Sequence, residues 1–284
     1  MLQIVSDLKG YFIEAKDGEI GTVNDFLFDD STFKVRWLVV DTGKWLTGRK
    51  VLIHPPAIRY ADHWTRKLTV DLTKSQIENS PDIAHDRPVS QQMQNALYGH
   101  YGWDPQSSGS LYGAAMVDGG QYIADMGSME PPLPARTYFG GNAASEALRG
   151  KSAIHDADPH LRSIAEVTGY DVHAIDGSIG YVENFLIDSQ SWIVRYVTID
   201  TSRWWFGQHV LISPHAMKEV DWTGRYIRLD IAREQVKASP PWSPEALIDE
   251  DFENRLYSHY NWPTDESKSL FESKSLLDNH EPGR

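Results

Sequence analysis

The chain contains one long sequence twice, and this repeat limits its fold more than any other feature. Residues 10–104 align with residues 169–263 at a constant offset of 159 without a gap, and 34 of the 95 paired positions are identical. Ungapped similarity over the length of a domain indicates duplication and fusion, because stacked repeats recur at much shorter periods. We therefore expect two copies of one fold in tandem.

The repeated segments have the pattern of short β-strands. Asp17-Gly18 and Asp176-Gly177 each fall between two apolar runs, which is a hairpin signal because glycine tolerates positive φ. VRWLVVDT (35–42) and VRYVTIDT (194–201) lack polar alternation, which is typical of a strand covered on both faces. The pattern predicts a mainly β fold, with about five or six strands in each copy closing a small barrel.

Each copy is predicted to end in short helices. Thr73-x-x-Gln76 is a capping box for the first helix, whereas Ala232 replaces the threonine in the second copy and weakens that cap. The second helix ends in the related phrases ALYGHYGWD (96–104) and RLYSHYNWP (255–263). Its apolar stripe is expected to pack on the barrel. The residues assigned a structural role in both copies are Trp45, His100, Tyr101, Trp103, His259, Tyr260 and Trp262.

The paired histidines raise the question of catalysis. His100 and His259 could act as general bases, since histidine titrates near neutral pH. A catalytic triad also needs a nucleophile, and the chain has no cysteine and no Gly-x-Ser-x-Gly elbow. We therefore predict that both histidines pack and donate a hydrogen bond. No catalytic, cofactor-binding or metal-binding residue is expected, and the chain is predicted not to be an enzyme.

Two acidic patterns receive structural interpretations. HDADPH (155–160) offers metal-ligand side chains, but its two histidines are five apart in a proline-containing segment, a spacing that we do not take as a ligand pattern, so we predict a solvated linker. Four aspartates recur at strand ends and are expected to bond turn amides or to pair with Arg36 and Arg195. They are Asp41, Asp71, Asp200 and Asp230.

An aromatic cluster in the second copy is the candidate interaction patch. SRWWFGQ contains Trp204, Trp205 and Phe206, where the first copy has GKWLTGR. The cluster falls between two strands, on a predicted loop. Two readings stay open: the rings pack on a neighbouring element, or they form an exposed contact with the other barrel, the linker or a second subunit.

Composition excludes several classes of function. There are 27 basic residues against 40 acidic ones, a net charge of −13, which argues against binding nucleic acid or an anionic membrane surface. No run of 18 apolar residues occurs, so no transmembrane segment is expected. The start MLQIVSDLKGYF lacks a signal-peptide pattern, and cysteine is absent. These features predict a cytoplasmic protein.

The repeats set the predicted domain boundaries. We expect a first barrel with its helix at 1–104, a linker at 105–160, a second barrel with its helix at 161–263 and a tail at 264–284. Residues 105–150 hold eight glycines and four prolines, which is typical of a linker. The tail is expected to fray, and the alternative is an amphipathic helix for a partner.

GYFIEAKDGEIGTVNDFLFD with VRWLVVDTGKWLTGRKVLI resembles the PRC-barrel family, named after the cytoplasmic domain of the photosynthetic reaction centre H subunit. GYDVHAIDGSIGYVENFLID with VRYVTIDTSRWWFGQHVLI is similar to it too. The resemblance implies two SH3-like β-barrels that serve binding or assembly, and it carries over no catalytic residue. We thus expect a non-enzymatic module whose partner is another protein, in a homo-oligomer or in peripheral contact with a membrane complex. The alternatives are a small-ligand sensor with a site between the barrels and a soluble partner of a photosynthetic-type membrane complex.

Overall fold

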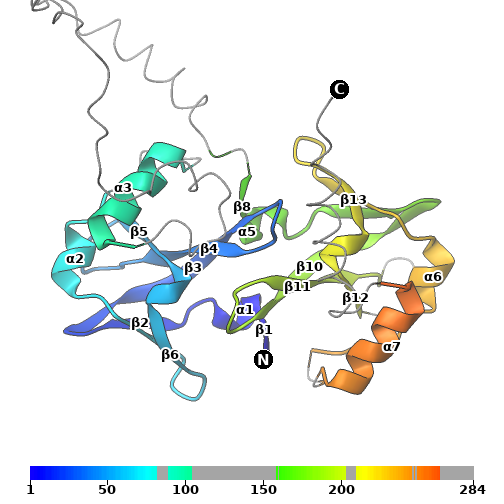
Figure 1. Ribbon diagram of the computed structural model, residues 1–284, viewed down its shortest axis with the longest axis horizontal. Helices are drawn as coiled ribbons and strands as arrows, with labels where there is room; N and C mark the ends of the chain where they lie inside the picture. The colour runs from blue at the N-terminus through cyan, green and yellow to red at the C-terminus, as the bar shows by residue number, and fades with distance from the viewer. Residues whose placement is uncertain are drawn as a thin grey trace, which may run out of the picture. The chain divides into compact units, whose positions relative to one another are not determined.

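The computed structural model describes residues 1–81, 89–103, 158, 160–202, 209–244, 246 and 248–262. Within these residues the fold is mainly β, with two seven-stranded sheets and a few short helices (Figure 1). Most of the predicted linker, the whole of the Trp204–Phe206 cluster and the predicted tail lie outside the described residues. No helix in the described part of the chain is long and apolar enough to cross a membrane.

The sheet of the first repeat has the strand order β5-β4-β3-β2-β7-β6, and β8 also pairs with β3. Two short helices, α2 and α3, follow its last strand. The bounds are β2 (Phe12–Ala15), β3 (Gly18–Asp29), β4 (Val35–Asp41), β5 (Lys50–Ile53), the 3-10 turn η1 (Pro55–Ala57), β6 (Ile58–Asp62), β7 (Lys67–Val70), α2 (Lys74–Glu78), α3 (Gln91–Tyr101) and β8 (Leu161–Ser163).

The sheet of the second repeat has the equivalent order β12-β11-β10-β9-β14-β13, and β1 also pairs with β10. The bounds are β1 (Leu2–Ile4), α1 (Val5–Leu8), α5 (Ile164–Val167), β9 (Asp171–Ala174), β10 (Gly177–Asp188), β11 (Val194–Asp200), β12 (His209–Ile212), η4 (Pro214–Ala216), β13 (Met217–Asp221), β14 (Tyr226–Leu229), α6 (Arg233–Lys237) and α7 (Glu250–Tyr260). The two repeats thus share one strand order, whereas closure of each sheet into a barrel stays a prediction.

Glycine is required at one repeated position in each sheet. Gly21 and Gly180 have φ of 153° and 151°, and a Cβ at either would lie 2.1 Å from the carbonyl oxygen of Asp41 or Asp200. The ladder between β2 and β3 shifts register beside Gly21, and that between β9 and β10 shifts beside Gly180. The repeated glycine therefore allows a β-bulge where two backbones approach closely.

The described residues form two compact units that do not coincide with the repeats. Unit 1 holds Met1–Tyr11, Asp25–Val35 and the described residues after Leu161, and unit 2 holds Phe12–Asn24 and the described part of Arg36–Leu161. Each unit has its own apolar core. Fully buried side chains include Ile13, Trp37 and Leu52 in unit 2, and Phe28, Phe185 and Tyr196 in unit 1. Burial of each such side chain contributes about 1.5–3 kcal/mol.

Unit 1 contains strands from both repeats because the first strand of each repeat pairs with the sheet of the other. β1 is antiparallel to β10, with Leu2 opposite Asp188 and Ile4 opposite Leu186. β8 pairs with β3 in the equivalent way. The β3–β4 hairpin and the β10–β11 hairpin also bond to each other near their turns. The Val35 N–H donates to the Trp192 carbonyl, and the Val194 N–H donates to the Phe33 carbonyl, both at 2.8 Å.

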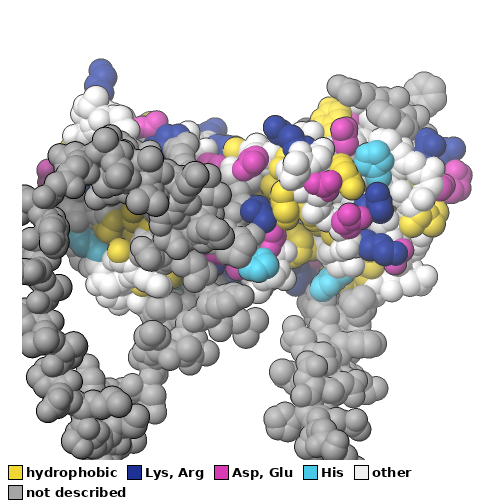
Figure 2. Space-filling model, turned by 90° about the horizontal axis from the view of Figure 1, so that it is seen from above, with side chains coloured by type: hydrophobic (Ala, Val, Ile, Leu, Met, Phe, Trp, Pro, Cys, Tyr) yellow, Lys and Arg dark blue, Asp and Glu magenta, His cyan; other side chains and the backbone are white. Residues whose placement is uncertain are grey.

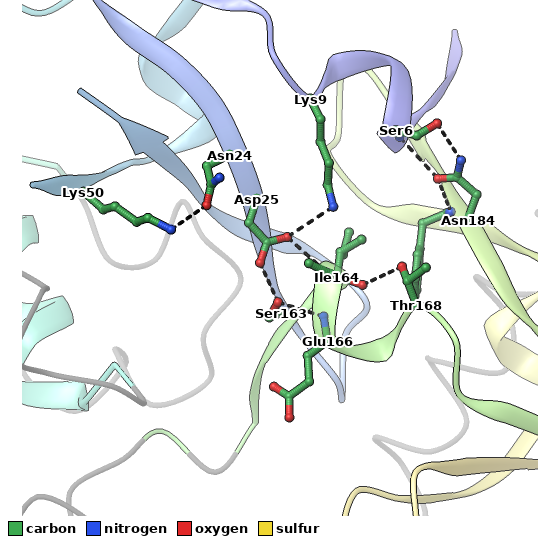
Figure 3. Close-up of polar contacts among 12 residues, drawn as sticks. Ser6, Lys9, Asn24, Asp25, Lys50, Ser163, Ile164, Glu166, Thr168 and Asn184 are labelled. Atoms are coloured by element: carbon green, nitrogen blue, oxygen red, sulfur yellow. Dashed lines mark hydrogen bonds and ion pairs between the residues drawn. The ribbon is translucent and has the colours of Figure 1, made fainter. Parts of the chain in front are cut away.

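The short helix α1 follows β1, and α5 follows β8. A polar side chain of the other repeat holds each of these helices (Figure 3). Asn184 Oδ1 accepts from the Ser6 N–H at 3.3 Å, and Asn184 Nδ2 donates to Ser6 Oγ at 2.7 Å. At the equivalent position, Asp25 accepts from the Ala165 N–H at 3.0 Å and from the Ser163 hydroxyl. These bonds fix α1 and α5 where they begin, within unit 1.

Candidate functional site

The histidine near the end of α3 and the one near the end of α7 make the same hydrogen bond. His100 Nε2 donates to the Gln76 carbonyl, and His259 Nε2 donates to the Gln235 carbonyl, each at 2.7 Å. Each bond ties α3 or α7 to the short helix that precedes it in the sequence. Because a carbonyl only accepts, the Nε2 proton of both histidines is engaged in this bond.

A tyrosine at the end of each of these helices stacks on the tryptophan that follows it, with the same geometry in both repeats. Tyr101 stacks on Trp103 with ring centroids 4.2 Å apart, and Tyr260 stacks on Trp262 at 4.4 Å. Burial raises the pKa of the Tyr101 phenol, and it raises the pKa of Tyr260 to about 12. Both phenols therefore stay protonated near neutral pH, and the stacks pack the chain that leaves each helix.

Asp158 departs from the predicted solvated linker, because it is buried in unit 2. Its Oδ2 accepts from Arg36 Nη1 and from Gln94 Nε2, both at 2.9 Å, and Trp37 Nε1 donates to Gln94 Oε1 at 3.1 Å. Asp158 and Arg36 are only 3% and 4% exposed. A buried guanidinium needs a carboxylate partner, and the linker end supplies it. His160 is described as well, whereas His155 lies outside the described residues.

The second repeat replaces this network with a simpler pair. Tyr196 and Glu253 occupy the positions of Trp37 and Gln94, and the Tyr196 hydroxyl donates to Glu253 Oε1 at 2.7 Å. Burial, reinforced by the Glu253 carboxylate, raises the pKa of Tyr196 far above its ordinary value. The phenol thus stays a neutral donor, which suits a link between β11 and α7.

The strand-end aspartates have structural partners. Asp41 accepts from the Gly43 N–H at 2.8 Å and Asp200 from the Ser202 N–H at 2.7 Å. Asp71 pairs with Lys16 and Arg59, and these cations lower its pKa to about 2. Asp230 lies 3.9 Å from Lys218. Arg36, an expected partner of these acids, pairs with Asp158 instead.

Trp45 is half-buried at the protein surface. The Lys74 ammonium lies 5.1 Å from its ring centroid, a cation–π distance. The sequence predicts a structural role for Trp45, and the structure places it in the loop after β4 and not in the core. Among the described residues, no cluster of three or more histidine or carboxylate side chains could hold a metal ion.

Three exposed aromatic residues gather on the β2–β7–β6 part of unit 2. Phe12 is 41% exposed, Tyr60 64% and Trp64 97%. We call Phe12, Tyr60 and Trp64 the aromatic face. Large aromatic side chains seldom remain this exposed without a role, because burying each one removes apolar area from water.

The strand register places these rings together. Phe12 is opposite Lys67 on β7, and Lys67 is opposite Asp62 on β6. Cross-strand partners share a face and side chains alternate along a strand, so Phe12 and Tyr60 lie on the outer face. Trp64 is in the β6–β7 turn, cyan in Figure 1, where its N–H donates to Asp62 Oδ1 at 2.9 Å.

The second repeat does not carry this aromatic face. Asp171, Glu219 and Thr223 occupy the three equivalent positions and are all exposed. The tryptophan of its hairpin, Trp222, is only half-exposed: its ring centroid lies 6.3 Å from that of Tyr170 and 4.3 Å from the guanidinium of Arg162. The fold therefore needs no aromatic residue at these positions. A position-by-position comparison of the repeats marks these three positions in the sequence, because each aromatic residue aligns with a polar one, whereas their exposure is seen only in the structure.

Comparison with known proteins gives one finding. Residues 4–77 match the PRC-barrel domain family, a span from β1 to α2 that includes every residue of the aromatic face. A search of curated proteins found no match.

Proposed function

We propose that this chain, with a PRC-barrel domain at residues 4–77, is a non-enzymatic protein-interaction module that binds its partner through the aromatic face. The observation that carries the proposal is the exposure of Phe12, Tyr60 and Trp64 where the second repeat has two carboxylates and a threonine. Tryptophan and tyrosine are enriched among residues that dominate the energy of protein interfaces.

The charges around the aromatic face indicate the chemistry of the partner. The surrounding positions carry four cations and three carboxylates, an excess of positive charge on a chain whose net charge is −13. The matching positions of the second repeat carry two cations and two carboxylates. The first set is Lys16, Arg59, Arg66, Lys67, Glu14, Asp62 and Asp71, and the matching residues, in the same order, are Ile175, Lys218, Arg225, Tyr226, His173, Asp221 and Asp230. We infer a protein partner with an apolar pocket for Trp64 and carboxylates at its rim.

The proposal extends to the architecture of the chain. Both sheets have the same strand order, and this supports a second PRC-like barrel at about 164–239 and closure of both sheets. Under this proposal, the first barrel binds the partner through the aromatic face. The equivalent surface of the second barrel, with Asp171, Glu219 and Thr223, stays in contact with solvent. On the face drawn in Figure 2, acidic and basic side chains are interspersed, as on an ordinary solvated surface.

Site-specific photo-crosslinking tests the proposal. A photoreactive phenylalanine analogue is placed at position 64, and in a matched control at position 223, in cells that produce the protein. We expect a protein adduct at 64 that is absent at 223. The captured protein is then purified and titrated by calorimetry with the wild type and with Phe12→Asp, Tyr60→Glu and Trp64→Thr combined. These substitutions copy the second repeat, and loss of three interface aromatics should weaken binding by at least about 100-fold.

A second variant guards against a folding artefact. Asp171→Phe, Glu219→Tyr and Thr223→Trp combined change the same positions of the second repeat and should leave affinity unchanged. Equal binding by the wild type and the first triple variant would refute the proposal. An adduct between two copies of this chain would identify the face as a self-association surface instead.

A further inference from the structure

The described residues leave the aromatic face of unit 2 open to solvent. Phe12, Tyr60 and Trp64 are all exposed there, on β2, on β6 and in the turn after β6. β6 is the last strand in its sheet order, so no described strand continues the sheet past it. Covering these rings would remove apolar area from water, so a segment of this chain that can reach them is a candidate ligand.

The segment between Trp103 and Asp158 begins and ends on the unit that carries the aromatic face. Trp103 stacks on the last residue of α3, and Asp158 is bonded to Arg36, all within unit 2. The C-terminal tail instead follows α7, which belongs to unit 1. A ligand within residues 104–157, which lie outside the described residues, is therefore tethered at both ends to the unit that holds its site.

This segment contains a proline-rich run in its sequence. Pro131, Pro132 and Pro134 surround Leu133 in EPPLP (130–134). Each proline fixes φ near −65°, so such a run favours the extended polyproline II conformation. Surfaces lined by aromatic rings bind runs of this kind, because a chain that is already extended loses little conformational entropy on binding.

The run can reach the aromatic face from both of its tethers. Pro131 is 28 positions after Trp103, and Pro134 is 24 positions before Asp158. At about 3.3 Å per residue, these two arms span up to roughly 90 and 80 Å. A compact domain of about 100 residues has a radius of gyration of about 13 Å, so every point on the surface of unit 2 is within reach.

Charge favours the same pairing. Residues 105–135 contain three carboxylates, Asp118, Asp125 and Glu130, and no lysine, arginine or histidine. The positions around the aromatic face carry four cations against three carboxylates. One of these cations, Arg59 on β6, keeps 69% of its side chain exposed. Like the partner inferred above, the segment thus combines apolar side chains with acidic ones.

We propose that Pro131–Pro134 of the same chain bind the aromatic face, with the acidic residues before this run directed toward the cations around it. The consequence rests on the proposed function, because the segment and the protein partner then compete for one surface. A tethered ligand acts at an effective concentration on the order of 1 mM, so a contact with a dissociation constant of about 0.1 mM is about nine-tenths filled. The partner therefore binds about tenfold more weakly than it would to an unoccupied face.

Photo-crosslinking within the purified full chain tests this docking. A photoreactive phenylalanine analogue replaces Leu133, and in a matched control it replaces Leu111 of the same segment. At low protein concentration, we expect position 133 to give an adduct that keeps the mass of one chain and maps to Phe12, Tyr60 or Trp64. Position 111 should give no adduct with these residues. The triple variant of the aromatic face described above should abolish the adduct from position 133.

Nuclear magnetic resonance of the full ¹⁵N-labelled chain gives a second readout. The indole N–H signal of Trp64 is assigned as the one missing from Trp64→Phe. Pro131→Gly combined with Pro134→Gly should move this signal and raise the affinity for the captured partner about tenfold. Ser107→Gly combined with Ser108→Gly changes the same segment outside the proline-rich run and should do neither.

The contrary outcomes separate this inference from the proposed function. A position-133 adduct that avoids the aromatic face, or a Trp64 signal unmoved by the proline substitutions, would overturn the docking of this segment. So would an adduct that joins two chains, because the proposal places both partners in one chain. Capture of a protein partner at position 64 in cells does not require the segment, and the adduct within one chain forms in purified protein without a partner.

Discussion

At the scale of single residues, burial decides what a polar side chain does. Asp158 lies in HDADPH, a run that local composition assigns to solvent, yet it is buried against Arg36. The sequence around an acid does not show which distant cation will face it, so this interpretation was wrong. Asp17 and Asp176 show the same limit: each accepts the first N–H of a short helix 57 positions further along the chain, at 2.7 and 2.8 Å, and the local turn pattern does not reveal that partner.

The buried pair leads to a prediction. Asp158→Asn removes the charge that compensates Arg36 inside unit 2, and loss of one partner of a buried ion pair should lower the free energy of unfolding by about 3 kcal/mol. Urea unfolding followed by circular dichroism measures the change. Glu234→Gln breaks the exposed pair with Lys237 and should alter stability by less than about 0.5 kcal/mol. Equal effects of the two substitutions would show that the Asp158 pair is solvated.

At the scale of elements, local signals predicted the caps correctly. Thr73 and Gln76 form the expected capping box of α2, and α6 begins at Ala232 without a side-chain cap. Gly102 and Asn261 end α3 and α7 in the left-handed conformation, as their residue types indicate. These features depend only on residues a few positions apart, so sequence suffices to find them.

The unequal caps predict unequal responses to substitution. Ala232→Thr should stabilise the protein by about 0.5–1 kcal/mol, because Gln235 already stands where a capping box needs it. Thr73→Ala should destabilise it by a similar amount. Thermal unfolding of both variants provides the measurement, and a lower melting temperature for Ala232→Thr would contradict the argument.

At the scale of the whole molecule, sequence predicted two equivalent sheets but not how strands are shared. The repeat offset relates β1 to β8, yet it cannot tell whether β1 pairs with β3 or with β10, because both offer the same residue pattern. The aromatic face was missed for a related reason, since strand periodicity does not show whether Phe12 or Tyr60 is covered. The aromatic composition of the Trp204–Phe206 cluster made it the candidate interaction patch. The cluster lies outside the described residues, so its role stays a prediction.

Strand sharing predicts that the halves hold together after the chain is cut. With a protease site engineered into residues 105–150, the cleaved protein should elute as one complex in size-exclusion chromatography, because unit 1 needs residues from both repeats. Asp25→Ala combined with Asn184→Ala removes the bonds that hold α5 and α1 and should promote separation of the fragments. Separation of the wild-type fragments in native buffer would contradict the sharing of strands.

The pairing of β1 with β10 also sets an order of events during synthesis. Ser6 and Asn184 are 178 positions apart, so at about 5–20 residues per second the ribosome makes Asn184 roughly 10–35 s after Ser6. For that time the nascent chain carries its first strand and helix with no sheet to join. Unit 1 can be completed only once the second repeat has emerged, and the earliest residues of the protein are among the last to reach their final place.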